Sequence, residues 1–340
     1  MAIDNVARLR KKASLLRGPI QIQFDLTTTC NFRCLHCYNA SGENNIVKDE
    51  LTDVEIMKLF SDFKHLQPFN LCFCGGEPLL RLDVMLKASS LIKSVVPNIS
   101  MVTNGYLLKK DTLEALIHSG INRIQISLDG NTKESHEMLR NAKGSYEKAI
   151  EAIELCLEYK DKLKEINICF IPTRFNIQEF HELSVRMLGK GVNIMRTQPL
   201  MLIGRAKDFH KKLMPTHFQY RTLIKTVISL QETYGQRRVQ YGDPVDHIIR
   251  FRSHLSNLFH QLCLRANGDI VTSMYFPIVA GNVRKHSIID YWEKGLVFIW
   301  NNEVVSDYAR NINCIFDLGR HINGYPNLWQ ETDIDIDILG

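Results

Sequence analysis

The residues most able to do chemistry are three cysteines in the segment TTTCNFRCLHCYN, residues 27–39. Cys30, Cys34 and Cys37 fall within eight positions, and the next cysteine along the chain is Cys72. Thiolates at this spacing in one loop converge on a soft metal centre, which suits an iron–sulfur cluster or zinc. Ferredoxin-type sequences use a different spacing and add a fourth cysteine before a proline, which is missing here. The segment therefore predicts a metal site whose fourth ligand comes from elsewhere.

Two alternatives fill that fourth place. The first alternative is a zinc site, in which the fourth ligand is His36, Cys72 or Cys74. Cys72 and Cys74, however, alternate with Phe73 in a strand-like run that is typical of buried thiols. In the second, a cube of four irons and four sulfides held by three thiolates leaves one iron open for a substrate or cofactor to chelate. The chain has nine cysteines and no recognisable export signal, so we expect reduced thiols in a cytoplasmic protein rather than a disulfide framework.

The composition fits a globular protein with an ordinary core. Its 340 residues are 45% hydrophobic, and 42 basic against 37 acidic side chains give a formal charge of +5 without a polybasic run. This charge does not favour a nucleic-acid partner. No apolar stretch approaches the roughly 20 residues that span a bilayer, so we expect no membrane partner either. Residues 5–16 fit a short basic helix packed on the core.

From residue 20 onward, β-rich runs alternate with amphipathic stretches. The expected strands are residues 20–26, 69–75, 98–104, 121–129, 165–173 and 192–199. The expected helices are residues 53–66, 82–96, 109–120, 145–159 and 177–190. Consecutive βα units imply a parallel sheet, and about 180 residues of repeat are too few for a closed eight-fold barrel of about 250 residues. We therefore predict an α/β fold built on a partial (β/α)6 TIM-like barrel.

The pattern changes after residue 199. Residues 268–276 and 280–283 carry short strand signals, and residues 287–295 carry a helix signal, which together indicate a smaller C-terminal α+β cap. The expected domains are an N-terminal helical extension (1–18), a core (19–235) and a C-terminal domain (236–340).

Polar residues follow every expected strand. In parallel barrels the active site forms from the loops at the carboxyl ends of the strands. The three cysteines follow the first strand. The residues at the ends of the other strands are Gly75, Gly76, Glu77, Thr103, Asn104, Gly105, Ser127, Asp129, Thr173, Asn176 and Gln198. We therefore expect one shared active site at this rim.

The motifs CNFRCLHC, GGEPLL and QISLDG together resemble the radical S-adenosylmethionine (radical SAM) enzymes, over residues 20 to about 205. The motif TNG followed by SLDG resembles the motif order of the radical SAM branch that carries a C-terminal SPASM or twitch extension. The resemblance implies that Cys30, Cys34 and Cys37 hold a [4Fe–4S] cluster whose open iron is chelated by SAM. It also implies that electron transfer into SAM releases a 5′-deoxyadenosyl radical, which abstracts hydrogen from the substrate.

The same resemblance implies contacts to SAM. Gly75, Gly76 and Glu77 would meet the SAM amino group through backbone carbonyls and the carboxylate. The other implied cofactor residues are Asn104 on the same rim, Ser127 and Asp129 near the ribose, and Arg140 beside the SAM carboxylate, with Asn176 as a further residue carried over.

Three of these residues also fit structural roles. Glu77 precedes Pro78 and fits a helix-start charge, and Asp129 before a glycine fits a turn. Arg140 fits a solvated helix end.

Residues 263–293 resemble a SPASM-type extension that has lost cysteines. Cys263 precedes a glycine hairpin, but Ser273 and Met274 occupy the place of the second cysteine, and Cys314 stands alone where paired cysteines are usual. Two cysteines cannot build a four-iron auxiliary cluster without other ligands, so we expect a single cluster. Cys263 and Cys314 are then expected to be buried thiols, with a catalytic hydrogen donor as the alternative.

The resemblance favours a peptide or protein side chain as the substrate, because peptide and protein maturases dominate the SPASM-like branch. The barrel is expected to begin near residue 20, without an N-terminal peptide-recognition domain, so recognition would use the C-terminal domain or a separate partner protein. A reductant such as flavodoxin or ferredoxin is also implied. The alternatives are a radical SAM enzyme of small-molecule or haem-type cofactor biosynthesis, and a non-enzymatic iron–sulfur or zinc protein that acts as an electron carrier or scaffold.

Overall fold

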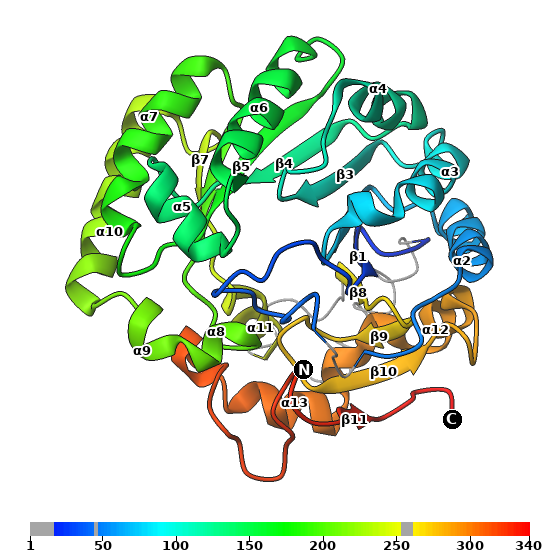
Figure 1. Ribbon diagram of the computed structural model, residues 1–340. Coiled ribbons are helices and arrows are strands. Elements are labelled where there is room, and N and C mark those ends of the chain that lie inside the picture. Colours follow the sequence, from blue (N-terminus) through cyan, green and yellow to red (C-terminus); the bar gives the residue numbers. More distant parts are fainter. Residues whose placement is uncertain (1–16, 44–46, 253–260) are drawn as a thin grey trace.

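A curved sheet forms the centre of the protein (Figure 1). In the computed structural model, which describes residues 17–43, 47–252 and 261–340, this sheet has eleven strands in the order β11-β10-β9-β8-β1-β2-β3-β4-β5-β6-β7. Strands β1 to β7 follow one another in sequence, and each pair is parallel. Helices cover the outside of the curve, and β7 and β11 are its two edges, so the barrel is open as predicted.

The elements match the predicted order closely. The strands are β1 (Gln21–Thr27), β2 (Asn70–Gly75), β3 (Asn98–Thr103), β4 (Arg123–Ser127), β5 (Glu165–Phe170), β6 (Ile194–Thr197), β7 (Val239–Tyr241), β8 (Gln261–Leu264), β9 (Asp269–Val271), β10 (Ile278–Asn282) and β11 (Ile334–Asp335). The α-helices are α2 (Asp53–Leu66), α3 (Leu82–Ile92), α4 (Lys110–Ser119), α5 (Lys133–Arg140), α6 (Ser145–Glu158), α7 (Phe180–Lys190), α8 (Arg205–Asp208), α9 (His210–Leu213), α10 (His217–Tyr234), α11 (Asp246–Arg252), α12 (Ile288–Lys294) and α13 (Glu303–Arg310). The 3₁₀ turns are η1 (Pro78–Arg81), η2 (Ile177–Glu179), η3 (Leu296–Asn301) and η4 (Ile315–Asp317).

All six predicted strands and all five predicted helices are present, with ends that differ by a few residues. The last of these helices begins as the 3₁₀ turn η2. The predicted helix at residues 5–16 lies outside the described residues. Within the described part of the chain, no helix has the length and apolar character needed to cross a bilayer.

Apolar and polar side chains alternate along the barrel strands. The apolar side chains pack against the outer helices, and the polar side chains face the interior of the barrel. On β1, Ile22 and Phe24 are fully buried, and the Phe24 ring lies 6.0 Å from that of Phe60 on α2. The alternate residues Gln21 and Gln23 line a cavity inside the barrel. Because successive side chains of a strand point to opposite faces, the same pattern repeated on neighbouring strands leaves a polar interior.

The C-terminal segment is an α+β unit, as predicted, but it continues the sheet of the barrel. Strand β8 pairs with β1 in parallel, with Gln261 opposite Gln21 and Cys263 opposite Gln23. Strands β9 and β10 then extend the same sheet in antiparallel fashion. Arg284 also ties this segment to α2, since its Nε lies 2.6 Å from Glu55 Oε1. The segment therefore forms part of the barrel wall beside β1.

Candidate active site

The three cysteines lie in the loop that leaves the carboxyl end of β1, and Arg205 at the start of α8 holds this loop. Its buried guanidinium donates from Nη1 to Cys34 O (2.8 Å) and from Nη2 to Ser41 O (2.8 Å). Its Nε donates to Glu43 Oε1 (2.5 Å), and its backbone N–H donates to Cys37 O (2.9 Å). A rigid guanidinium that satisfies several acceptors fixes a loop that has no helix or strand of its own.

Two glycines allow neighbouring segments to approach the cysteine loop. A Cβ at Gly76 would lie 2.0 Å from Thr29 O, and a Cβ at Gly204 would lie 2.2 Å from Tyr38 O. Both oxygens belong to the backbone of the loop and cannot move aside cheaply. The glycines of the GGEPLL and LIGRA segments are therefore required for packing against the loop.

Cys30, Cys34 and Cys37 are free thiols that line one cavity. Cys37 Sγ lies 3.0 Å from Asn39 Oδ1, and Cys34 Sγ lies 3.8 Å from Arg140 Nη1. Burial raises the pKa of Cys34 to about 12, and the Arg140 guanidinium opposes that rise. A buried thiolate at this place needs a stronger positive partner, which metal ions supply, because a coordinating thiol is deprotonated outright.

The three thiols are the soft donors that iron–sulfur clusters use. In the described part of the chain, no group of three His, Cys, Asp or Glu side chains surrounds a single-ion site. His36, one of the predicted zinc ligands, has its Nε2 3.2 Å from Asp129 Oδ2. Each thiolate of a four-iron cube binds a different iron, so the three sulfurs need not meet on one point. The donor set therefore fits a [4Fe–4S] cluster.

Glu77 lies behind the cavity wall rather than on it. It is fully buried, its Oε1 accepts from Thr103 Oγ1 (2.8 Å) and Leu79 N (3.2 Å), and its Oε2 accepts from Asn104 N (2.9 Å). Burial raises the pKa of Glu77 to about 7. The carboxylate thus caps η1 and fixes the end of β3. Glu77 thus has the helix-start role that the sequence offered as an alternative, and its contact with the SAM amino group stays a prediction.

Asp129 is also enclosed, and it holds Arg140. Its Oδ2 lies 2.6 Å from Arg140 Nη2 and 3.2 Å from His36 Nε2, while its Oδ1 accepts from Ile171 N (2.8 Å). Burial disfavours the charged form of Asp129, but the Arg140 guanidinium and the neighbouring His36 outweigh burial and hold the pKa of Asp129 below its usual range. The carboxylate of Asp129 therefore positions Arg140, and its predicted place near the ribose stays a prediction. Arg140 lines the cavity and is not the solvated helix end of the alternative.

Asn176 connects the backbone segments that follow β4 and β5. Its Nδ2 donates to Asp129 O (2.6 Å) and Ile171 O (3.0 Å), and its Oδ1 accepts from Thr173 N (2.6 Å). Each polar atom of the side chain therefore has a protein partner, and the residue acts in positioning.

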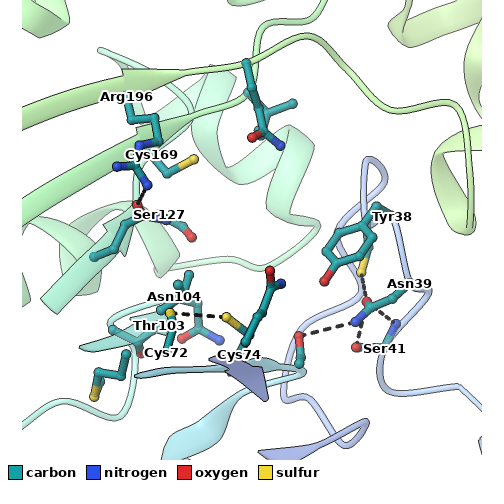
Figure 2. A pocket seen from close by; sticks show the side chains of 18 of the residues that line it. Tyr38, Asn39, Ser41, Cys72, Cys74, Thr103, Asn104, Ser127, Cys169 and Arg196 are labelled. Atoms are coloured by element: carbon teal, nitrogen blue, oxygen red, sulfur yellow. Dashed lines mark hydrogen bonds between the residues drawn. The ribbon is translucent and has the colours of Figure 1, made fainter. Parts of the chain in front are cut away.

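The cavity has a volume of about 490 Å³ and runs along the inside of the barrel to the cysteine loop. It brings together most of the predicted site. The predicted residues that line it are Cys30, Cys34, Cys37, Gly75, Gly76, Thr103, Asn104, Ser127, Arg140 and Gln198. In Figure 2, Tyr38, Asn39 and Ser41 of the cysteine loop lie across the pocket from Thr103 and Asn104 at the end of β3. Asn104 Nδ2 also donates to Asn31 Oδ1 (2.8 Å), which joins the end of β3 to that loop.

The two C-terminal cysteines occupy different settings. Cys263 is buried on β8 and lines a smaller neighbouring cavity of about 40 Å³ with Tyr275 and Gln23. Cys314 is exposed, so the expectation of a buried thiol is wrong there. The reason is local, because Cys314 begins the surface turn η4, where its N–H donates to Asp317 Oδ2 (3.0 Å).

Several cavity residues were not among the predicted site residues. Cys72 Sγ and Cys74 Sγ lie 3.4 Å apart, and hydrogen bonding from Cys74 lowers the pKa of Cys72. Both thiols, assigned to the core from the sequence, line the cavity together with Cys169, Arg196 and Tyr275. The available signal was the alternation of polar and apolar residues along β2, β5 and β6. Arg205 had no comparable signal.

A three-cysteine loop at the end of the first strand of an open parallel barrel, facing a polar interior, is the arrangement expected for the radical SAM class of enzymes. Residues 24–184 match the family model described as the radical SAM superfamily, so the chain carries a radical SAM domain. The protein is therefore an enzyme, and the family of this domain implies SAM and a [4Fe–4S] cluster as cofactors.

Two related proteins show how much of the chain is shared with known radical SAM enzymes. The AdoMet-dependent heme synthase of Methanosarcina barkeri is 25% identical over 309 residues, which cover 84% of this chain and 85% of the relative. The mycofactocin maturase MftC of Mycolicibacterium smegmatis is 28% identical over 233 residues, which cover 68% of this chain and only 56% of MftC.

Solved structures agree on the fold. Streptococcus suis SuiB bound to S-adenosylmethionine has a TM-score of 0.66 at 16% identity, over 93% of this chain and 75% of SuiB. SuiB bound to its precursor peptide SuiA has a TM-score of 0.65 at 17% identity, over 92% of this chain and 71% of SuiB.

Proposed function

We propose that the enzyme holds one [4Fe–4S] cluster on Cys30, Cys34 and Cys37 and binds SAM in the barrel cavity. The observation that carries this proposal is the set of three free thiols around one cavity, in a loop fixed by the buried Arg205. When bound, the reduced cluster and SAM would supply a 5′-deoxyadenosyl radical that abstracts hydrogen from the substrate.

The residues of this chain would bind and orient SAM. Arg140, held by Asp129, offers its guanidinium to the SAM carboxylate. Ser127 and Asn104 offer neutral hydrogen-bonding groups from the ends of β4 and β3. Gly76 and the glycine before it offer backbone carbonyls to the amino group. The surrounding barrel keeps bulk water away from the reacting atoms.

We infer the division into an N-terminal extension (1–18), a radical SAM core (19–235) and a SPASM/twitch-like C-terminal domain (236–340). The sheet strands β8 to β10 and the contrasting settings of Cys263 and Cys314 support a C-terminal domain without its own four-iron cluster. Anaerobic reconstitution should then give about four iron atoms per chain, and about eight would contradict a single cluster.

We propose a ribosomally made peptide or protein side chain as the substrate. Support comes from a relative named as a mycofactocin maturase and from the fold shared with SuiB, a protein solved with a precursor peptide. A flavodoxin or ferredoxin would reduce the cluster, and the peptide would be recognised by the C-terminal domain or by a separate partner protein.

The second candidate is haem-type cofactor biosynthesis. The relative named as a heme synthase aligns over 84% of this chain, a longer stretch than the maturase, and includes the C-terminal region. In this alternative the same thiols and SAM residues act on a small molecule.

Co-expression followed by mass spectrometry separates the two candidates. Short peptides encoded near the gene are co-expressed with the wild-type enzyme or with Cys34→Ala, in ordinary water and in D₂O. We expect loss of hydrogen, deuterium uptake or methyl gain in a peptide, only with the wild type. Unchanged peptides together with conversion of a haem precursor would contradict the peptide proposal.

A further inference from the structure

Among the described residues that line the cavity inside the barrel, one cation has no carboxylate partner. The charged or titratable nitrogen and carboxylate groups that line it belong to His36, Arg123, Arg140, Glu165 and Arg196. Arg123 pairs with Glu165 (3.4 Å), and both His36 and Arg140 pair with Asp129. Among the residues that the structure describes, Arg196 forms no ion pair with a carboxylate. The interior of the barrel therefore favours an anion beside Arg196.

Two neutral amides fix the Arg196 guanidinium in place. Its Nη1 donates to Gln125 Oε1 (3.2 Å), and its Nε and Nη2 donate to Gln240 Oε1 (3.2 and 2.8 Å). A guanidinium has five N–H donors, so these bonds leave one N–H on each terminal nitrogen. The amides orient the group without neutralising it. Such a group is preorganised for a carboxylate, which accepts two parallel hydrogen bonds from an arginine.

The Arg196 guanidinium reaches β4 at Gln125, two positions before Ser127, and so lies further from the carboxyl end of that strand than the expected SAM contact. Arg196 of β6 lies opposite Cys169 of β5, and Cys169 lies opposite Ser127 of β4. Neighbouring strands are about 4.8 Å apart, so the backbones of Arg196 and Ser127 are about 10 Å apart along one row of the sheet. Figure 2 shows Arg196, Cys169 and Ser127 along the same wall of the pocket. Arg140 already offers SAM a guanidinium, which leaves Arg196 for a second molecule.

We propose that Arg196 binds a carboxylate of the substrate, so that the substrate enters the barrel with an acidic side chain or a free carboxyl end. This proposal rests on the proposed function, because it takes the cavity as the place where SAM and substrate meet. The residue is a binding and specificity group, and it selects a carboxylate over the uncharged amide of the same shape.

The test compares glutarate with glutaramide, which differ only in carboxylate against amide. The cluster-reconstituted enzyme with saturating SAM is titrated with each compound under argon, and binding is followed by ligand-observed NMR. We expect glutarate to bind about ten- to a hundredfold more tightly, the range given by charge-assisted hydrogen bonds. Arg196→Gln should remove this preference. Arg221→Gln, which removes an exposed arginine of α10, should retain it.

Three results would overturn the proposal. One is an unchanged preference in Arg196→Gln. If that variant does not fold, Arg196→Lys keeps the charge without the fork and should weaken the preference, so an unchanged preference in the lysine variant also overturns the proposal. The third is a preference that appears only without SAM, because Arg196 would then bind the SAM carboxylate. Failure of the peptide proposal is distinguishable, since unchanged peptides in co-expression leave the glutarate preference intact.

Discussion

Replacing Arg205 with glutamine should open the cysteine loop and leave the barrel folded. The substitution removes the guanidinium donors of two backbone oxygens, those of Cys34 and Ser41, and of the Glu43 carboxylate. A hydrogen bond from a charged donor contributes about 1.5–3 kcal/mol. Glu43 is exposed, so its ion pair contributes little. At the low end of this range, losing the two hydrogen bonds to backbone oxygens lowers the free energy of loop opening by about 3 kcal/mol.

Thiol alkylation of the cluster-free protein measures this opening. Cys34 is buried and reacts with iodoacetamide only when the loop opens, so the alkylation rate follows the free energy of local opening. A loss of about 3 kcal/mol corresponds to a rate increase of roughly a hundredfold. Mass spectrometry of digested samples gives the rate for each cysteine separately. Cys156, fully buried on α6, serves as the internal reference and should react at the wild-type rate.

Two outcomes would refute the role of Arg205. Equal Cys34 rates in wild type and Arg205→Gln would mean that the guanidinium does not hold the loop. A parallel increase for Cys156 would mean that the substitution weakens the whole barrel rather than the loop. Arg221→Gln removes the same charge from an exposed helix position and should change neither rate.

Three further predictions test other parts of the structure. Gly76→Ala places a Cβ 2.0 Å from Thr29 O, so it should lower the free energy of unfolding by about 1–3 kcal/mol in thermal denaturation, and an unchanged midpoint would argue against this close contact. Burial raises the pKa of Asp25 from 3.8 to about 7, so the folded protein keeps a proton that the unfolded chain releases. Stability from this group is complete below pH 4 and is lost as the pH rises through 7, by up to about 4 kcal/mol, and urea titrations should show a shallower pH dependence in Asp25→Asn. Cys37→Ala should abolish iron retention, whereas the exposed Cys314→Ala should keep the wild-type iron content.

The barrel and the cysteine loop could be predicted because their signals are local. Alternation of apolar and polar residues defined β1 to β6, and the spacing of Cys30, Cys34 and Cys37 needed no tertiary information. The strand-end rule then placed Asn104 and Ser127 on the cavity correctly.

The rest depends on contacts between distant segments. Glu77 and Asp129 stand at strand ends like the cavity residues, but each faces buried donors whose positions follow only from the packed barrel. Arg205 reaches back to a loop more than 160 positions earlier in the chain. The pairing of β8 with β1 is equally remote, so the sequence could not indicate that the C-terminal segment extends the barrel sheet.

The central claim is that the three-thiol loop activates SAM inside the barrel. Its most direct test is formation of 5′-deoxyadenosine from SAM by the cluster-loaded enzyme with dithionite under anaerobic conditions, measured by liquid chromatography without added substrate. The wild type should form it, and Cys34→Ala should form none. Absence of 5′-deoxyadenosine from a wild-type sample with a full iron content would contradict the claim.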